Sequence, residues 1–266
     1  MLDAQYNPKT WLNAMASVSR FVTICTAVLL VAPAVRADEL NHAREYARCM
    51  GLAPSDPDDA FEMATAWKAL GGGDAAEHCA AVALLYSGQA EFAARRLEVL
   101  AETIVAEPDF KGQILAQAGQ AWLLHGDAPR AEAALSKAVE LLRGQPAVMV
   151  DRAQARAAMG DYKGAVEDLT NAISADPSMV DAYTFRASAY RYLDELGKAK
   201  ADADAALLLD PDNPAALLER GILFRLRGND DAARADWVRV LEIDPDGEAG
   251  KLARANIEKM DVQTGN

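Results

Sequence analysis

Aromatic residues, basic residues and cysteine are all scarce in this chain. Only 6% of its 266 residues are aromatic, although 51% are hydrophobic and alanine is abundant. Because strands favour aromatic and β-branched residues, this balance favours thin, closely packed helices over a sheet-based core. The 27 Lys+Arg against 40 Asp+Glu give a formal net charge of −13. That excess argues against nucleic acid as a partner, whose phosphates require a basic surface, and against adsorption to an anionic membrane.

Long apolar runs are missing too, apart from one near the start. Phe21–Val35 is an apolar run that follows Arg20 and leads into Val35-Arg36-Ala37. It is shorter than the ~20 residues that a membrane-spanning helix needs, and the residues at its end suit a signal-peptide cleavage site. We therefore expect residues 1–37 to be a signal peptide cleaved after Ala37, and the mature protein to be periplasmic or secreted.

Cleavage would remove three basic residues and one acidic residue, leaving 24 basic and 39 acidic residues and a net charge of −15. The stretch before Arg20 is long for a signal peptide, so the start codon is either Met1 or Met15. We expect no stable membrane insertion after cleavage.

The cysteines are few enough to be treated one by one. Cys25 lies within the apolar run, preceded by Ile24 where a lipid-anchor site requires a small residue. The mature chain keeps Cys49 and Cys79, and an even pair in an exported protein indicates a disulfide because the compartment permits one. The alternatives are two ordinary buried thiols, or a metal or catalytic site that includes His78.

What the chain does contain is a repeat. The dipeptides Asp176-Pro177, Asp210-Pro211 and Asp244-Pro245 place proline at the same interval twice in succession. Extended back along the chain, this period defines the segments 112–145, 146–179, 180–213 and 214–247. Three positions in each segment hold small residues, with one valine: Gly119, Ala153, Ala187 and Gly221; Ala131, Ala165, Ala199 and Ala233; and Ala138, Ala172, Ala206 and Val240. A larger side chain at a small-residue position between packed helices would overpack the contact.

The turn residues agree with this period. Gly126, Gly160 and Gly228 stand where a first helix should end, because glycine adopts the left-handed conformation freely. Each Asp-Pro dipeptide closes a second helix, because proline prevents its continuation. Local chemistry and global period therefore predict the same helix pairs.

This pattern resembles the tetratricopeptide repeat, a helix–turn–helix unit of about 34 residues. The resemblance implies an all-α fold, a right-handed superhelical solenoid of antiparallel helix pairs with about six units and a C-terminal cap helix. The pattern is degenerate over 38–111, where units at 40–73 and 74–107 are followed by a shift of register at 108–111. Residues 248–266 are expected to form the capping helix and the tail.

A charged pattern runs through the same repeats. Three arginines share one position of the first helices, three aspartates share one of the second helices, and the segment 112–145 has Ala118 and Ala134 in both places instead. Because both charges are present together or absent together, we predict structural ion pairs within each repeat. The pairs are Arg152 with Asp168, Arg186 with Asp202, and Arg220 with Asp236.

The sequence offers little for catalysis. His42, His78 and His125 are the only histidines, and none has a set of neighbours typical of metal ligands. The Gly71–Gly73 stretch lacks the lysine and the serine or threonine of a phosphate-binding loop. We therefore predict no catalytic, cofactor-binding or metal-binding residues, and no cofactor.

The resemblance also implies where a partner would bind, because the first helices of such repeats line a concave groove. Carried over to this chain, the groove positions include Gln120, Leu123, Val150, Gln154, Thr184, Ser188, Arg191, Tyr192, Ile222 and Arg225. The lysines and asparagines with which some members clamp a C-terminal carboxylate are missing here. Arg191 and Arg225 either hold a carboxylate of the ligand in bidentate fashion or simply keep the groove solvated.

These patterns predict a non-enzymatic scaffold that binds a partner peptide or protein in the groove. The alternative is a structural subunit that self-associates within a cell-envelope complex. A third hypothesis, an enzyme with a site near Cys49 and His78, requires converging titratable groups in a pocket. The fold alone does not decide among them.

Overall fold

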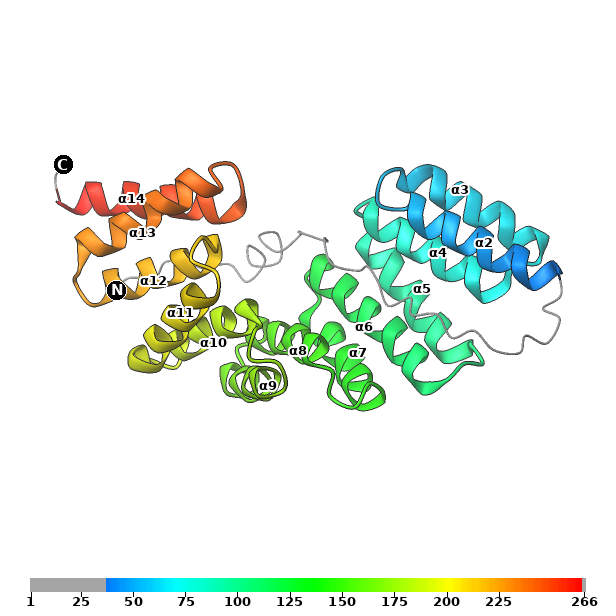
Figure 1. Ribbon diagram of the computed structural model, residues 1–266, viewed down its shortest axis with the longest axis horizontal. Helices are drawn as coiled ribbons and strands as arrows, with labels where there is room; N and C mark the ends of the chain where they lie inside the picture. The colour runs from blue at the N-terminus through cyan, green and yellow to red at the C-terminus, as the bar shows by residue number, and fades with distance from the viewer. Residues whose placement is uncertain (1–36, 265–266) are drawn as a thin grey trace. The chain divides into compact units, whose positions relative to one another are not determined.

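The computed structural model describes residues 37–264, and all regular elements in that range are helical. The predicted signal peptide therefore lies outside the described residues, except for Ala37. The chain divides into two compact units, which are described one at a time. The N-terminal unit is described over 37–142 and the C-terminal unit over 143–264 (Figure 1). The boundary between them follows Leu142, whereas the sequence places the change from degenerate to regular repeats at residue 112. Within 37–264, no helix has both the length and the apolar character needed to cross a membrane.

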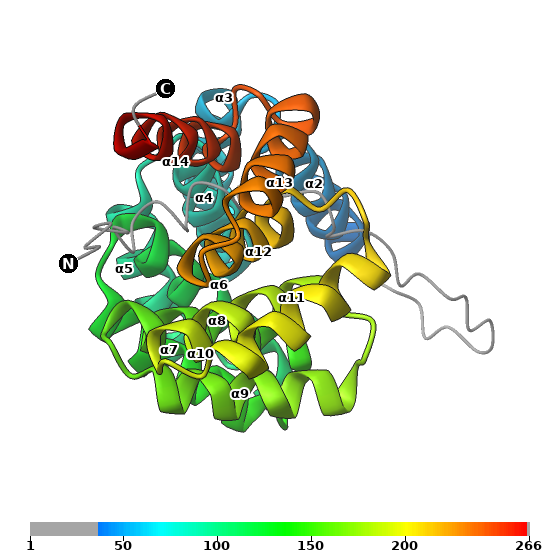
Figure 2. The same ribbon diagram turned by 90° about the vertical axis from the view of Figure 1, so that its left-hand side faces the viewer.

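The C-terminal unit consists of three antiparallel helix pairs and one further helix (Figure 2). The pairs are α8 (Pro146–Ala158) with α9 (Tyr162–Ala175), α10 (Val180–Tyr192) with α11 (Leu196–Leu209), and α12 (Pro214–Leu226) with α13 (Asp230–Ile243). The further helix, α14 (Glu248–Thr264), adds Ala249, Ala253 and Met260 to the buried cluster around Trp237 and Val240. It thereby covers the apolar side of the last pair, as a cap helix must.

Small residues allow the two helices of a pair to approach closely. A Cβ atom added to Gly221 of α12 would clash with the indole of Trp237 on α13. The same indole donates a hydrogen bond from Nε1 to the carbonyl oxygen of Leu218, at 3.3 Å. The bulky side chain of one helix thus fills the space that glycine leaves on the other.

The turns inside the pairs follow one pattern with one exception. Gly160 and Gly228 have positive φ angles of 82° and 75°, and the residues after them, Asp161 and Asn229, cap the second helix by accepting a backbone N–H. In the repeat 180–213 the same position is held by Asp194, with φ 59°. An aspartate adopts this left-handed conformation at a cost that glycine avoids.

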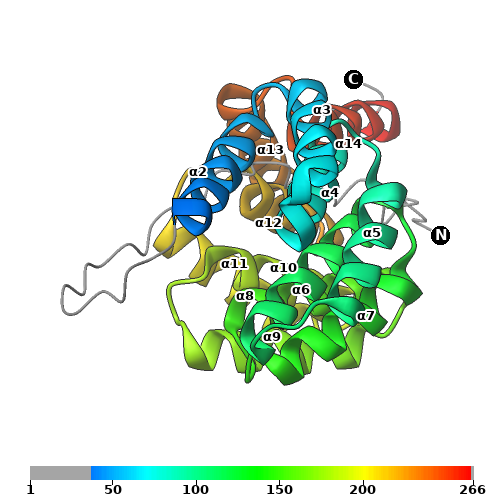
Figure 3. The ribbon, with the colours of Figure 1, turned by 90° about the vertical axis from the view of Figure 1, so that its right-hand side faces the viewer.

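The regular elements of the N-terminal unit are helices too (Figure 3). Its helices are α2 (Ala37–Leu52), α3 (Pro57–Trp67), α4 (Gly73–Tyr86), α5 (Ala90–Thr103), α6 (Pro108–His125) and α7 (Ala128–Leu141). A π-helical turn, Lys68–Gly72, joins α3 to α4 and contains the positive φ angle of Gly71, 96°. Helix α2 packs against both α3 and α4.

Helix α6 differs from the expectation at its start. It begins at Pro108, so the segment 108–111 forms its first turn. Proline is well suited to this position, because the first N–H groups of a helix have no partner inside the helix. The pairs α8–α9, α10–α11 and α12–α13 each lie within one of the predicted repeat segments, and α6–α7 lies within 112–145 apart from this extra turn.

Candidate functional site

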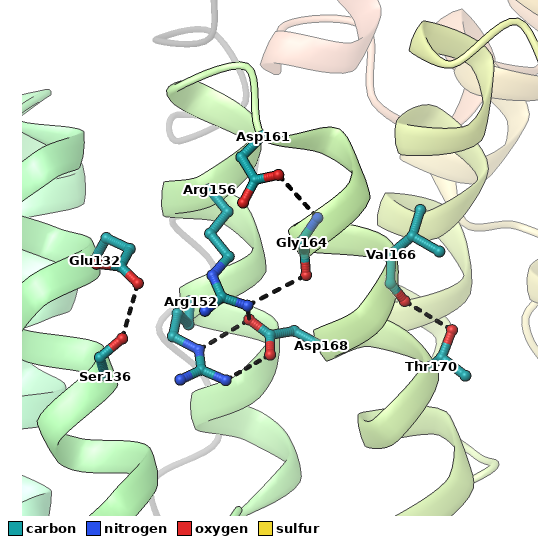
Figure 4. Close-up of polar contacts among 9 residues, drawn as sticks. All are labelled: Glu132, Ser136, Arg152, Arg156, Asp161, Gly164, Val166, Asp168 and Thr170. Carbon is teal, nitrogen blue, oxygen red and sulfur yellow. Dashed lines mark hydrogen bonds and ion pairs between the residues drawn. The ribbon is translucent and has the colours of Figure 1, made fainter.

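The structure brings the predicted Arg–Asp pairs together in all three repeats. Arg152 donates from Nε and Nη2 to the two carboxylate oxygens of Asp168, at 2.9 and 2.6 Å (Figure 4). Arg186 binds Asp202 in the same bidentate way, at 2.7 and 2.8 Å. Each aspartate is buried between the two helices of its repeat, so these contacts are more specific than surface ion pairs.

The third pair has the same geometry. Arg220 donates to Asp236 at 2.8 and 2.7 Å. The hydrogen bond to Asp236 raises the pKa of Arg220, and the one to Asp202 raises the pKa of Arg186, so both guanidinium groups stay charged. All three pairs therefore join a first helix to the second helix of its own repeat.

Two of these arginines also reach the repeat before them. Arg186 donates from Nη1 to the hydroxyl of Thr170, at 3.1 Å, and Arg220 Nη1 lies 3.8 Å from a carboxylate oxygen of Asp204. Thr170 and Asp204 occupy the same position of consecutive second helices. The arginines thus link neighbouring repeats as well as the two helices within a repeat.

The first pair has a second arginine that the sequence pattern did not indicate. Arg156, one turn after Arg152 on α8, donates from Nη1 to Asp168 at 2.9 Å, so one buried carboxylate binds two guanidinium groups (Figure 4). The equivalent positions on α10 and α12 hold Tyr190 and Phe224. A residue that occurs in one repeat only gives no periodic signal.

The predicted groove residues of the C-terminal unit differ in how much they offer a partner. Val150, Thr184 and Ser188 are buried by the chain itself. Their role in the described structure is therefore packing. Gln154 and Ile222 are partly buried, and Tyr192 is exposed.

Arg191, predicted either to hold a carboxylate of a ligand or to keep the groove solvated, binds a carboxylate of the chain itself. Arg191 donates from Nε and Nη2 to the buried carboxylate of Glu219 on α12, at 2.6 and 3.2 Å, and from Nη2 to the Ser188 hydroxyl at 3.1 Å. Burial opposes the charged form, but the charge of Glu219 raises the pKa of Arg191 above its usual value. Arg191 thus joins α10 to α12. Arg225 likewise pairs with a carboxylate of the chain, Asp230, at 2.5 Å.

Exposed apolar side chains gather where the first helices of this unit end. Tyr192 and Leu226 occupy the same repeat position on α10 and α12, and they are 39% and 43% exposed. The ring of Tyr192 stacks on Tyr162 with 4.5 Å between centroids, and the Arg191 guanidinium lies 4.5 Å from the Tyr192 centroid. Met159, just after α8, is exposed to a similar degree. We call Met159, Tyr192 and Leu226 the apolar row, because each stands at or just after the end of a first helix.

The groove residues of the N-terminal unit both lie on α6. Leu123 is buried, and Gln120 is partly buried. Neither offers a partner an exposed apolar side chain.

The cysteine and histidine residues also lie in the N-terminal unit. Cys49 on α2 and Cys79 on α4 lie at disulfide distance, with 6.2 Å between their Cα atoms. The neighbouring His78 is buried between two hydrogen-bond partners, the Tyr46 hydroxyl at Nδ1 (2.7 Å) and the Gln117 Oε1 at Nε2 (2.6 Å). The amide oxygen can only accept, so Nε2 donates and Nδ1 accepts the Tyr46 hydroxyl proton. Burial lowers the pKa of His78, more than the bond to Gln117 raises it.

This neighbourhood contains no arrangement suited to metal binding. Across residues 37–264, no three His, Cys, Asp or Glu side chains are grouped so that they could hold a metal ion. His42 accepts a hydrogen bond from the Trp67 indole at 3.3 Å. Both nitrogens of His78 are engaged in a neutral network, which links α2, α4 and α6.

Antiparallel helix pairs that recur with one fixed period define a helical repeat protein of the solenoid class. A family model described as Tetratricopeptide repeat matches residues 150–198 and 186–248. Residues 150–248 thus match the tetratricopeptide repeat family, and the all-helical fold predicted from the sequence is confirmed for the described residues. No curated protein is significantly similar in sequence.

Solved structures show the same fold. TTC0263 from Thermus thermophilus, a thermophilic TPR protein, is 20% identical, with a TM-score of 0.57 over 70% of this chain and 100% of that one. MamA from Desulfovibrio magneticus RS-1 is 23% identical, with a TM-score of 0.54 over 62% of this chain and 90% of that one. YrrB, described as a TPR protein with an unusual peptide-binding site, is 16% identical, with a TM-score of 0.52 over 69% of this chain and 91% of that one. At these identities the likeness concerns the fold alone.

Proposed function

We propose that the chain is a non-enzymatic scaffold, and that the first helices of its C-terminal unit bind a peptide or protein partner. The observation that carries this proposal is the apolar row of Met159, Tyr192 and Leu226. Large apolar side chains that remain partly exposed at the ends of successive first helices are suited to anchoring a partner, because their burial releases water. The peptide-binding site described for YrrB supports the same use of this fold.

Arg191, a partly buried residue of the predicted groove, supports this surface. Arg191, held by Glu219, stacks on Tyr192 and fixes its ring against Tyr162. A ring that is already ordered loses little rotamer freedom when a partner covers it. We therefore assign partner contact to Tyr192, Leu226 and the partly exposed Gln154 and Ile222, and a supporting role to Arg191.

Affinity capture from the native cell envelope tests this assignment. The bait is the double variant Tyr192→Ser and Leu226→Ser, compared with the unchanged chain. The control is Leu208→Ser, because Leu208 is 85% exposed but lies on a second helix, α11. We expect the double variant to lose its partners about tenfold or more in quantitative mass spectrometry, and the control to retain them. Loss in the control alone would instead favour the structural-subunit alternative, in which second helices make the contacts.

We also propose that the mature chain works outside the cytoplasm, in the periplasm or as a secreted protein. The facing cysteines support this proposal, because disulfides persist in oxidising compartments. Peptide mapping of the native protein without reductant should give an N-terminus at Asp38 and a peptide that joins Cys49 to Cys79. An intact N-terminus with both thiols free would contradict it.

A further inference from the structure

A cluster of cationic side chains surrounds one tryptophan at the end of α6 in the N-terminal unit. The Arg95 guanidinium, from α5, lies 5.7 Å from the ring centroid of Trp122, and that of Arg130, from α7, lies 4.6 Å away. The ring of His125 meets Trp122 edge-on, with 5.8 Å between centroids. Three consecutive helices thus direct a cationic or protonatable group to the same aromatic ring.

Trp122 holds these groups in place. Its side chain is fully buried, and its Nε1 has no hydrogen-bond partner among the described residues. A guanidinium group within about 6 Å of an indole centroid is attracted by the π-electrons of the ring. Arginine stacked in this way keeps the N–H groups at its edge available for a carboxylate. The ring therefore orients Arg95 and Arg130 without using up their hydrogen-bond donors.

The carboxylates of Glu91 and Asp127 contact the cluster through partly exposed ion pairs. Glu91 accepts from Arg95 at 2.8 Å and lies 3.9 Å from His125, and Asp127 lies 3.4 Å from Arg130. All of these side chains are about a third to a half exposed, and ion pairs at such exposure contribute little to stability. An incoming carboxylate could therefore replace Glu91 at low cost.

The electrostatic surroundings of Glu91 indicate that the cluster favours a negative charge. The hydrogen bond from Arg95, together with the charges of Arg95, His125 and Arg130, lowers the pKa of Glu91. The first turn of α5 adds to this field, because Gln89 at its N-cap makes no side-chain hydrogen bond to the exposed N–H groups.

We propose that this cluster, Arg95, Trp122, His125 and Arg130, docks the carboxylates of an acidic segment of a partner protein, with Glu91 as the competing carboxylate of the chain itself. The charge of the rest of the unit supports this choice. Residues 37–142 carry 8 basic and 17 acidic side chains, so a basic cluster here contrasts with a negative surface. The negative charge of the rest of the unit disfavours the attachment of an acidic segment elsewhere on it. The cluster shares no residue with the apolar row of the C-terminal unit, and its test does not depend on that proposal.

Fluorescence anisotropy of the purified full chain with a labelled peptide that alternates glutamate and alanine tests the proposal. The control peptide has glutamine in place of glutamate. We expect Arg95→Gln and Arg130→Gln each to weaken binding of the acidic peptide about three- to tenfold, and Glu91→Gln to strengthen it about two- to fivefold. The matched control is Arg48→Gln on α2, which removes one positive charge from the same unit where the side chain is 72% exposed, and it should leave the affinity unchanged.

The gain expected for Glu91→Gln separates docking from a loss of folding, because an unfolded variant cannot bind more tightly. The indole N–H signal of Trp122 in a ¹H–¹⁵N spectrum, identified by its loss in Trp122→Phe, should shift as the acidic peptide is added. Equal losses in Arg48→Gln, Arg95→Gln and Arg130→Gln would overturn the proposal, because they would reflect net charge alone. Binding of a phosphoserine peptide without binding of the glutamate peptide would overturn the choice of ligand. A dimer that dissociates in Arg130→Gln would overturn the choice of a partner protein in favour of a second copy.

Discussion

The two units hold their helices together in different ways. In the C-terminal unit one polar contact recurs, a buried aspartate bound by an arginine in each of three repeats. In the repeat 112–145 the same two positions hold buried alanines, Ala118 and Ala134. The N-terminal unit instead has individual contacts between its helices, such as the facing pair Cys49 and Cys79 and the hydrogen bonds of His78.

This difference follows from the repeat frame. Where the frame is regular, each repeat meets its neighbours in the same geometry, so one favourable contact can be used again. Where the frame is degenerate, each contact must be made separately, and a cross-link stabilises mainly by restricting the unfolded chain. The C-terminal unit should therefore be sensitive to the loss of a buried charge, and the N-terminal unit to reduction.

The largest effect is expected for Asp168→Ala. Asp168 is 1% exposed and binds both Arg152 and Arg156, so its loss breaks two mostly buried ion pairs at once. We expect the free energy of unfolding to fall by about 3–5 kcal/mol, measured by urea denaturation. The control is Asp236→Ala, whose arginine is more exposed and retains Asp204 at 3.8 Å, so the loss should be about 1–2 kcal/mol. Equal losses would mean that burial does not set the cost.

Removing the cysteine pair should affect the N-terminal unit nearly as much. The two cysteines are separated by 30 residues, and a disulfide that closes such a loop contributes about 3–4 kcal/mol in the chain-entropy description. In the double variant Cys49→Ala and Cys79→Ala, hydrogen-exchange mass spectrometry should show faster exchange in α2–α4 and unchanged exchange in α10–α12. Reductant should reproduce this result in the unchanged chain and add nothing in the variant. Uniform acceleration across both units would contradict the comparison.

The period of the repeat could be predicted from the sequence because the same residue pattern recurs in several consecutive segments. Three Asp-Pro dipeptides and the matched appearance of arginine and aspartate gave both the helix pairs and the residues that meet across them. Arg191 and Glu219 were beyond this reasoning. Their separation along the chain differs from the period of the repeat, and although Arg225 repeats the position of Arg191, no other repeat has a glutamate at the position of Glu219. Periodicity carries no information about a contact made once.

Burial was the second quantity that the sequence did not provide. The groove positions carried over from the resemblance include Val150, Thr184 and Ser188, which neighbouring side chains cover in this chain. Whether a first-helix residue is exposed depends on the size of the residues on the adjacent helices, which differ from repeat to repeat. The surroundings of Trp122 could not be predicted from the sequence either, because the groups around it, Arg95, His125 and Arg130, come from three different helices.

His78 allows the individual contacts of the N-terminal unit to be tested by pH. Burial lowers its pKa below the ordinary value of 6.5, so the unfolded chain binds this proton more readily than the folded chain. Stability from His78 is therefore present above pH 6.5 and is lost as the pH falls from there through the lower pKa of the folded state. Each unit of difference between the two pKa values corresponds to about 1.4 kcal/mol. The variant His78→Gln should have a flatter stability profile between pH 8 and 5 in urea denaturation, and an identical slope in both chains would show that His78 does not titrate on unfolding.

The smallest effect is expected in the turn between α10 and α11. Asp194 has φ 59° where the neighbouring repeats have Gly160 and Gly228, yet the backbone hydrogen bonds of the turn are the same: Asp194 N–H to Arg191 at 3.0 Å, and Gly160 N–H to Ala157 at 2.9 Å. Asp194→Gly should therefore stabilise the chain by about 0.5 kcal/mol, because it removes the cost of the left-handed conformation and keeps every bond. The converse change, Gly160→Asp, should destabilise the chain by a similar amount. Thermal melts of both variants and of the unchanged chain measure these effects. If both variants were destabilised, the Asp194 side chain would make a stabilising interaction of its own, and the left-handed conformation would not decide the stability of this turn.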